Sequence, residues 1–150
     1  MHAADARTLP PLRHPIHPVL LCFPMACLVG ALLTDLVYWR TAEMMWADFS
    51  AWLVSAGAIL TWLAAIGGIV DLVGRRYAAV APVSWTWIYV VANIVIIVLA
   101  TLNMFVHTRD AWTSVVPWGL TLSIATFLVL AITAWIGWVG LYRHDRTRLA

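Results

Sequence analysis

Long stretches without charged residues dominate this chain. Four of them lack Asp, Glu, Lys and Arg altogether, and they hold 21, 22, 32 and 32 residues (14–34, 49–70, 77–108 and 111–142). A helix that crosses a bilayer needs roughly 20 mostly apolar residues. The apolar residues run on without alternating with polar ones, which favours helices over strands. We therefore predict four membrane-spanning helices, at about residues 18–39, 51–73, 84–106 and 114–140.

The connections between these spans are short. We expect loops at 40–50, 74–83 and 107–113. Short connections make sequential helices antiparallel. The predicted fold class is all-α, a polytopic membrane protein with an up-down-up-down four-helix transmembrane bundle. Tails at 1–17 and 141–150 flank the transmembrane domain at 18–140.

Composition excludes other classes of protein. Hydrophobic residues make up 63% of the 150 residues and charged residues 11%, whereas soluble domains run at about 45–50% and about 25%. A small chain exposes much of its surface, so a soluble globular protein is excluded, and so is a disordered one. The net charge of +2 comes with no dense basic patch, which excludes nucleic acid as a partner. The expected partner is the lipid bilayer.

The arginines predict the orientation in the membrane. With four spans, the two tails and the 74–83 loop share one side and carry seven of the nine Arg, while the other side carries Arg40 and Arg109. Positively charged residues stay on the cytoplasmic side. We expect a multi-pass protein of the bacterial inner membrane with both termini in the cytoplasm. Nine of the ten Trp lie near the predicted boundaries, where their amphipathic rings are favoured.

Small residues at four-residue spacing predict where helices pack closely. Lipid tails are as apolar as leucine, so helices associate through close packing and polar contacts. Two lines of such residues are candidate helix–helix seams, one in the first span and one in the second: Ala26, Gly30 and Thr34, and Gly57, Thr61 and Ala65. A second copy or another membrane protein is the expected protein partner.

Polar residues at the cytoplasmic ends of the spans are candidate ligands. His14 and His17 each precede a proline, which pushes them out of the helical region. We therefore predict an extended segment with His17 at the N-cap of the first helix and Pro18 inside it. Asp71 ends the second span and His144 follows the fourth, so all four residues should meet at one membrane face.

Two kinds of cofactor suit this group, and a purely structural role remains open. A divalent metal ion would be held by His14, His17, Asp71 and His144. A haem b would be held axially by His17 and His144. In the structural interpretation, His14 and His17 pack at the headgroup boundary and His144 is a solvated tail residue.

A second, looser polar group is expected on the opposite side. It contains Asp35, His107, Arg109 and Asp110. Intramembrane polar residues are costly, so each is a functional hypothesis. We expect Asp35 to pair with Arg40 or Arg109. This polar group could alternatively line a polar path, or it could stabilise the rim of the bundle through ion pairs.

The spacing along the first and third spans adds two expectations. His17 and Asp35 are five helical turns apart and share one face, unless Pro24 rotates the helix. Asn93 and Asn103 can hydrogen-bond across helices and stabilise the bundle.

Motifs of familiar chemistry are missing. The chain has no Gly-rich phosphate loop, Cys-x-x-Cys, His-Glu-x-x-His or G-x-S-x-G motif, and we expect no catalytic activity. Cys22 and Cys27 point to different sides of one helix, so they cannot form a disulfide within it.

Several motifs together resemble a known family. They are the His-Pro-x-His-Pro element at 14–18, Phe23-Pro24, an Asp closing each of the first two spans, Asn93, Arg109 and the 137–144 ending. This pattern resembles the uncharacterised four-helix bacterial membrane proteins of domain of unknown function 2231, over about residues 14–145. The resemblance implies a membrane location and a four-helix fold without a defined activity. The chain departs from the family at Cys22, where a further His is common, and at Asp145, where Gly is usual.

Three functions stay open. The first is an integral inner-membrane protein without catalysis, a small subunit or scaffold that uses its small-residue seams. The second is a redox or metal-binding membrane protein with haem b or a metal at the cytoplasmic rim. The third is a small transporter or proton path, against which the lack of broken helices and of mid-membrane charge counts.

Overall fold

The computed structural model describes residues 16–74, 83–109 and 114–148, with side chains over 16–74, 87–109 and 115–138. It contains four long helices, α1 (His17–Thr41), α2 (Met44–Val73), α3 (Val83–His107) and α4 (Leu120–Arg148), and a π-helical segment, η2 (Ser114–Gly119). Each long helix contains a stretch that is apolar and long enough to cross a membrane. The predicted all-α fold with four candidate spans is confirmed.

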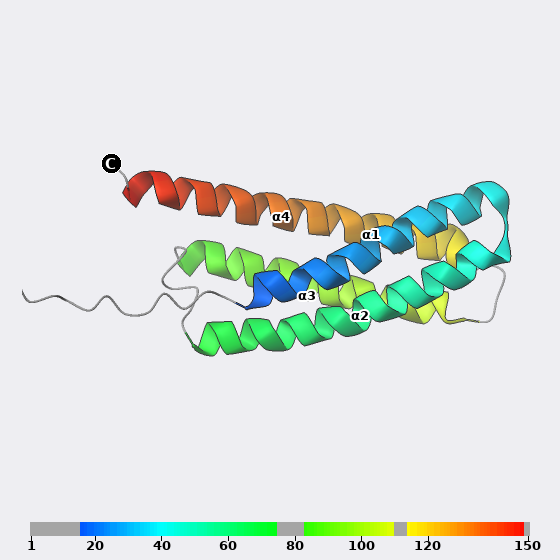
Figure 1. Ribbon diagram of the computed structural model, residues 1–150, viewed down its shortest axis with the longest axis horizontal. Coiled ribbons are helices and arrows are strands. Elements are labelled where there is room, and N and C mark those ends of the chain that lie inside the picture. The colour runs from blue at the N-terminus through cyan, green and yellow to red at the C-terminus, as the bar shows by residue number, and fades with distance from the viewer. Residues whose placement is uncertain (1–15, 75–82, 110–113, 149–150) are drawn as a thin grey trace, which may run out of the picture.

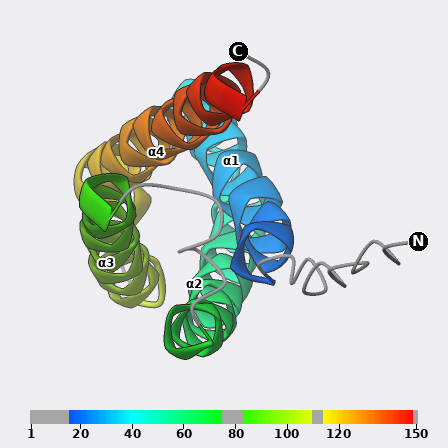
Figure 2. The same cartoon turned by 90° about the vertical axis from the view of Figure 1, so that its left-hand side faces the viewer.

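The helices form a ring of four. They run side by side and alternate in direction (Figure 1). α1 packs against α2 and α4, and α3 packs against the same two helices (Figure 2). The contact between α1 and α2 is the most extensive. Each helix therefore turns one face toward the bundle interior and leaves the other outside.

The buried face of each helix is narrow and holds the polar residues. Buried positions recur every three or four residues, the period of one helix face. In α1 and α2 this face includes His17, Leu28 and Asp35, and Ser50, Thr61 and Asp71. In α3 and α4 it includes Asn93, Ile96, Asn103 and His107, and Ser123, Leu130 and Thr133. Large apolar side chains such as Phe23, Trp52 and Phe105 are exposed on the outer surface, where lipid replaces water as the solvent.

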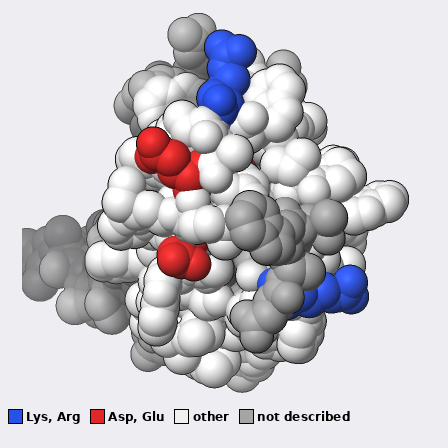
Figure 3. Space-filling view, turned by 90° about the vertical axis from the view of Figure 1, so that its right-hand side faces the viewer, with Lys and Arg blue, Asp and Glu red and all other residues white. Residues whose placement is uncertain are grey.

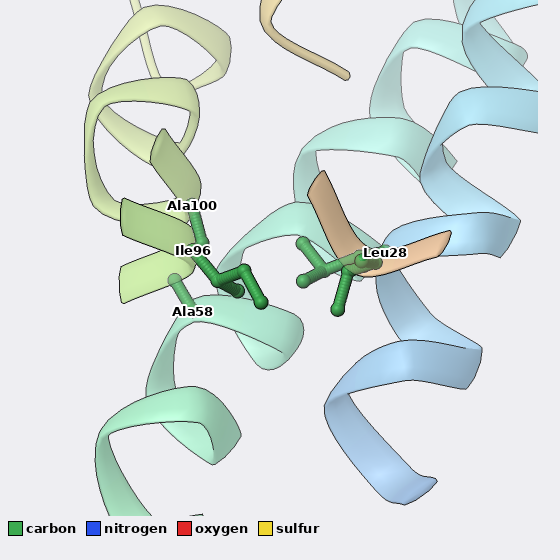
Figure 4. Close-up of a cluster of buried hydrophobic side chains, with 5 residues drawn as sticks. Leu28, Ala58, Ile96 and Ala100 are labelled. Carbon is green, nitrogen blue, oxygen red and sulfur yellow. The ribbon is translucent and has the colours of Figure 1, made fainter. Parts of the chain in front are cut away.

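An apolar layer crosses the middle of the bundle. It consists of Leu28 from α1, Ala58 from α2, Ile96 and Ala100 from α3, and Leu130 from α4 (Figure 4). Ile96 and Ala100 are at most 1% exposed. All four helices thus meet around a small apolar core, with buried polar residues on either side of it along each helix.

The helix ends differ from the expected boundaries. α2 begins at Met44 rather than at residue 51, so only Ala42 and Glu43 separate it from α1. Ala42 makes this turn in the left-handed conformation (φ 55°), and its N–H donates to the Tyr38 carbonyl at 2.8 Å. A helix can continue past a charged residue where it leaves the hydrocarbon region of the membrane. The exposed Asp48 therefore lies within α2. For the same reason α4 continues through Arg148.

Prolines lie at the start of α1, where Pro18 follows His17, and in η2 just before α4. Ile16, with φ −85° and ψ −36°, is the N-cap of α1, so the predicted extended conformation of His17 is wrong and His17 is already helical. Val116 is extended (φ −119°, ψ 127°) just before Pro117, as the residue before a proline tends to be. Pro24 lies inside α1 without ending it.

The small-residue lines bring α1 and α2 together within the chain. A Cβ added at Gly57 of α2 would lie 2.9 Å from Leu28 Cδ2, and one added at Gly67 would lie 2.7 Å from Leu20 Cδ1. On the α1 side, a Cβ at Gly30 would lie 3.3 Å from Leu53 Cδ1. The absence of side chains at these glycines lets the two helices approach closely. Gly30, Gly57 and the neighbouring Gly67 are therefore already packed inside one protein chain, whereas Ala26 of the first line is exposed.

Candidate functional site

Two clusters of buried polar residues lie at opposite ends of the ring, and the first surrounds His17. We call the group of His17, Asp71, Asn93 and Tyr89 the His17 cluster. Asp71 Oδ2 accepts hydrogen bonds from two backbone N–H groups, that of Ile16 with an N–O distance of 2.6 Å and that of His17 with one of 2.7 Å. The first N–H groups of a helix have no partner inside it, so a carboxylate of α2 caps α1. This pair of bonds explains why His17 is helical although Pro18 follows it.

The His17 ring is engaged at both nitrogens. Nδ1 lies 2.7 Å from the Ala64 carbonyl oxygen, and since a carbonyl only accepts, Nδ1 carries the proton. Nε2 lies 3.2 Å from Asn93 Oδ1, and the Asn93 amide donates to the Tyr89 carbonyl at 2.8 Å. The ring packs edge-on against Tyr89 at 5.8 Å and closely against Gly68, where a Cβ would lie 3.1 Å from Nδ1. The cluster fixes α1 against α2 and α3.

The second cluster surrounds Asp35 and draws on all four helices. We call the group of Asp35, Ser50, Asn103, His107 and Ser123 the Asp35 cluster. Asp35 is fully buried. Its Oδ1 accepts from the Ser50 hydroxyl and contacts His107 Nε2 at 2.9 Å, and its Oδ2 accepts from the Ser123 hydroxyl at 2.5 Å. One carboxylate therefore links α1 to α2, α3 and α4.

His107 and Asn103 complete this cluster from α3. His107 Nδ1 donates to the Asn103 carbonyl at 3.1 Å, and the Asn103 amide donates to Ser123 Oγ at 2.9 Å. Asn103 Oδ1 is a buried side-chain oxygen for which the described residues supply no hydrogen-bond partner. Since such atoms are rare in proteins, this oxygen calls for a donor.

The structure brings some of the predicted residues together and separates others. His17, Asp71 and Asn93 meet in one cluster, and Asp35 and His107 in the other. The prediction that Asp35 pairs with Arg40 or Arg109 is wrong, because both arginines are exposed and the carboxylate faces inward to His107. A long exposed arginine keeps its charge in water or at the headgroups at no desolvation cost.

The predicted cofactor ligands are only partly within the described residues. His14 and Asp110 lie outside them, and His144 lies in α4 beyond the last described side chain. Among the side chains that are described, no three His, Cys, Asp or Glu come together as a metal site. A haem or metal at His17 would have to replace one of its two ring contacts. Binding of haem b or a metal by His14, His17, Asp71 and His144 stays a prediction.

Two serines that bind Asp35 were not among the predicted site residues. Ser50 and Ser123 are each fully or almost fully buried, at 0% and 2% exposure. A signal was present in the second span, where Ser50, Gly57, Thr61 and Asp71 follow the three- and four-residue spacing of one helix face. Cys22 and Cys27 are free, with Cys22 exposed on the outer surface.

The chemistry available to the two clusters differs. The His17 cluster joins a carboxylate to backbone N–H groups and an imidazole to neutral oxygens. The Asp35 cluster joins a carboxylate to an imidazole, a pair that is charged when the ring is protonated. An ionisable pair inside a membrane bundle marks a functional candidate.

Comparison with protein families identifies the chain. The model of the family described as predicted membrane protein (DUF2231) matches residues 13–147, and the chain belongs to this family. Comparison with curated proteins and with solved structures finds no match. The family assignment agrees with the four apolar helices and carries no activity with it.

Proposed function

We propose that this member of the family is a non-catalytic module of the bacterial inner membrane, a small subunit or scaffold with both termini in the cytoplasm. The location of seven of nine arginines on the side of the termini supports this orientation. A reporter that is active only in the cytoplasm should be active when it is fused to the C-terminus. A periplasmic C-terminus would contradict the orientation.

One observation carries the non-catalytic role: both buried carboxylates hold helices together. Asp71 caps α1 from α2, and Asp35 links all four helices through Ser50, His107 and Ser123. Each carboxylate is at 0% exposure. Groups that are packed and hydrogen-bonded in this way position helices rather than present themselves to a substrate. The result is a bundle fixed at both ends.

The subunit role concerns the outer surface of the bundle. Since Gly30, Gly57 and Gly67 are occupied between α1 and α2, a partner would contact the outward faces of the helices. Native mass spectrometry of the full chain, released from lipid nanodiscs, should show an assembly of more than one chain. A single chain under every lipid composition would contradict a role as subunit of a homo-oligomer, and a chain that copurifies alone from its own membrane would contradict a role in a larger complex.

The two alternative functions are tested by separate measurements. No described contact favours haem or metal, because both His17 ring nitrogens are engaged. A visible spectrum and metal analysis of the purified protein decide this point, and a Soret band lost in His17→Ala would establish haem. The apolar layer of Leu28, Ile96 and Leu130 does not favour a continuous polar path for transport.

A further inference from the structure

The hydrogens of the Asp35 cluster can be assigned from its acceptors. His107 Nδ1 lies 3.1 Å from the Asn103 carbonyl oxygen, which only accepts, so Nδ1 carries a hydrogen. His107 Nε2 lies 2.9 Å from Asp35 Oδ1. A ring lone pair and a carboxylate lone pair repel at this distance, so one further proton lies between these atoms. Whether it resides on the ring or on the carboxyl, Asp35 and His107 together hold it.

Among the direct contacts of the Asp35 carboxylate, only this proton compensates its negative charge. Asp35 faces Ser50 from α2, His107 from α3 and Ser123 from α4, and the two hydroxyls are neutral. Arg40 and Arg109 are exposed. Tyr38, one turn further along α1, is buried against Ala47 and Val115. Asp35 and His107 are each 0% exposed, so an uncompensated charge would be costly there.

Asn103 provides a place for a second ligand. Ser123 donates its hydrogen to Asp35 Oδ2, and its oxygen therefore accepts from the Asn103 amide nitrogen. This direction fixes the orientation of the amide and leaves Asn103 Oδ1 as a buried acceptor without a described partner, in a side chain that is 1% exposed. A buried water molecule is the usual donor to such an atom.

The cluster lies near one end of the bundle. The apolar layer around Leu28 and Ile96 lies between it and the His17 cluster. At the other end, His107 is the last residue of α3, and the exposed Thr108 and Arg109 follow it directly. Figure 3 views the bundle from this end, where the surface is mostly uncharged, with scattered arginine and acidic side chains.

We propose that the Asp35 cluster is a proton-binding site, in which Asp35 and His107 share one exchangeable proton and a water molecule bound at Asn103 Oδ1 exchanges it with the aqueous phase beside Thr108. On release, the proton passes to the water, which leaves as hydronium. The Asp35 carboxylate and a neutral His107 ring with its Nδ1 hydrogen remain. This site goes beyond the proposed scaffold role and does not depend on it.

Infrared difference spectra of the full chain in lipid nanodiscs test the proposal. The pH is stepped between about 2.5 and about 10, a range that brackets the ordinary pKa values of carboxyl and imidazole groups. We expect carboxyl and imidazole difference bands that are lost in Asp35→Asn and in His107→Gln. The control Asp48→Asn, on an exposed aspartate of α2, should keep them.

Each outcome decides the question. A wild-type spectrum without these bands overturns the proton site, and so do bands that persist unchanged in Asp35→Asn or His107→Gln. If one variant does not fold, the other and the wild-type spectrum still decide. Asn103→Leu removes the acceptor for the water and should slow deuterium exchange of the shared proton. An unchanged exchange rate would overturn the role of the water.

Discussion

The His17 cluster and the Asp35 cluster solve the same problem in different ways. Each buries a carboxylate at 0% exposure in a bundle with an apolar exterior. Asp71 is matched by the N–H groups of Ile16 and His17 at the start of α1, where the helix dipole favours a negative charge. Asp35 is matched by side chains from three other helices, one of them a histidine.

The difference determines what each cluster can respond to. The Asp71 cap joins a carboxylate to two backbone N–H groups, which do not themselves take up or release a proton. A carboxylate–imidazole pair depends on one proton, and it loses its balance of charge when that proton leaves. Asp71 therefore anchors the start of α1 through its backbone, whereas Asp35 and His107 share a proton between two side chains.

Removal of Asp35 should have the largest effect. Asp35→Ala leaves the hydroxyls of Ser50 and Ser123 and the ring of His107 without their acceptor, and breaking a buried pair costs about 3–5 kcal/mol. Equilibrium unfolding in mixed detergent, followed by circular dichroism, measures the loss. Asp48→Ala, at an exposed position on α2, should change little. Equal effects of the two substitutions would contradict the bonding described for Asp35.

Removal of Asp71 should cost less, because the two hydrogen bonds that it accepts from α1 come from neutral backbone N–H groups. Asp71→Ala leaves the N–H groups of Ile16 and His17 to be satisfied otherwise, at about 1–3 kcal/mol. Hydrogen exchange at the start of α1 should rise with little change near Thr41. Glu43→Ala is a suitable control, since Glu43 precedes α2 without a side-chain cap. Protection that stays high at Ile16 and His17 would show that Asp71 does not cap α1.

Close packing between the clusters can be tested at Gly57. In Gly57→Ala the new methyl group would meet Leu28 Cγ and Cδ2 at 2.9 Å. Overpacking costs about 1–3 kcal/mol, partly offset by about 1 kcal/mol of helix propensity. The same unfolding measurement should show a net loss of roughly 1 kcal/mol. Gly30→Ala meets only the flexible end of Leu53 at 3.3 Å and should be neutral, so a larger effect there would contradict this packing.

Removal of one hydroxyl should have the smallest effect. Ser123→Ala takes one of three hydrogen bonds from Asp35 and the Ser123 acceptor from the Asn103 amide, and it leaves His107 in place. Interhelical hydrogen bonds in membranes are worth about 0.6 kcal/mol on average. Ser55→Ala, a half-buried serine of α2 outside both clusters, is the matched control. A loss as large as that of Asp35→Ala would mean that Ser123, rather than the pair with His107, holds the cluster together.

Some contacts followed from spacing, and others did not. His17 and Asp35 were expected on one face of the first span, and both are buried. Asp71 was expected near His17 because Asp71 ends the second span and His17 begins the first at the same membrane face, and they are in contact. Pairing of Asp35 with Arg40 or Arg109 rested on charge alone. It was wrong because charge does not say which way a side chain points, and a rim arginine gains more from solvent than from a buried partner.

The sequence by itself determined the class of solvent, the helices and their alternation. Uninterrupted apolar stretches must lie in lipid, and in lipid the backbone must satisfy its own hydrogen bonds. Only the tertiary structure decided that Ser50 and Ser123 meet Asp35, that Asn93 meets His17, and that the glycines face inward between α1 and α2. These contacts depend on how each helix is rotated about its axis and on which helices are neighbours. That choice follows from packing among residues far apart in the chain, which local spacing does not encode.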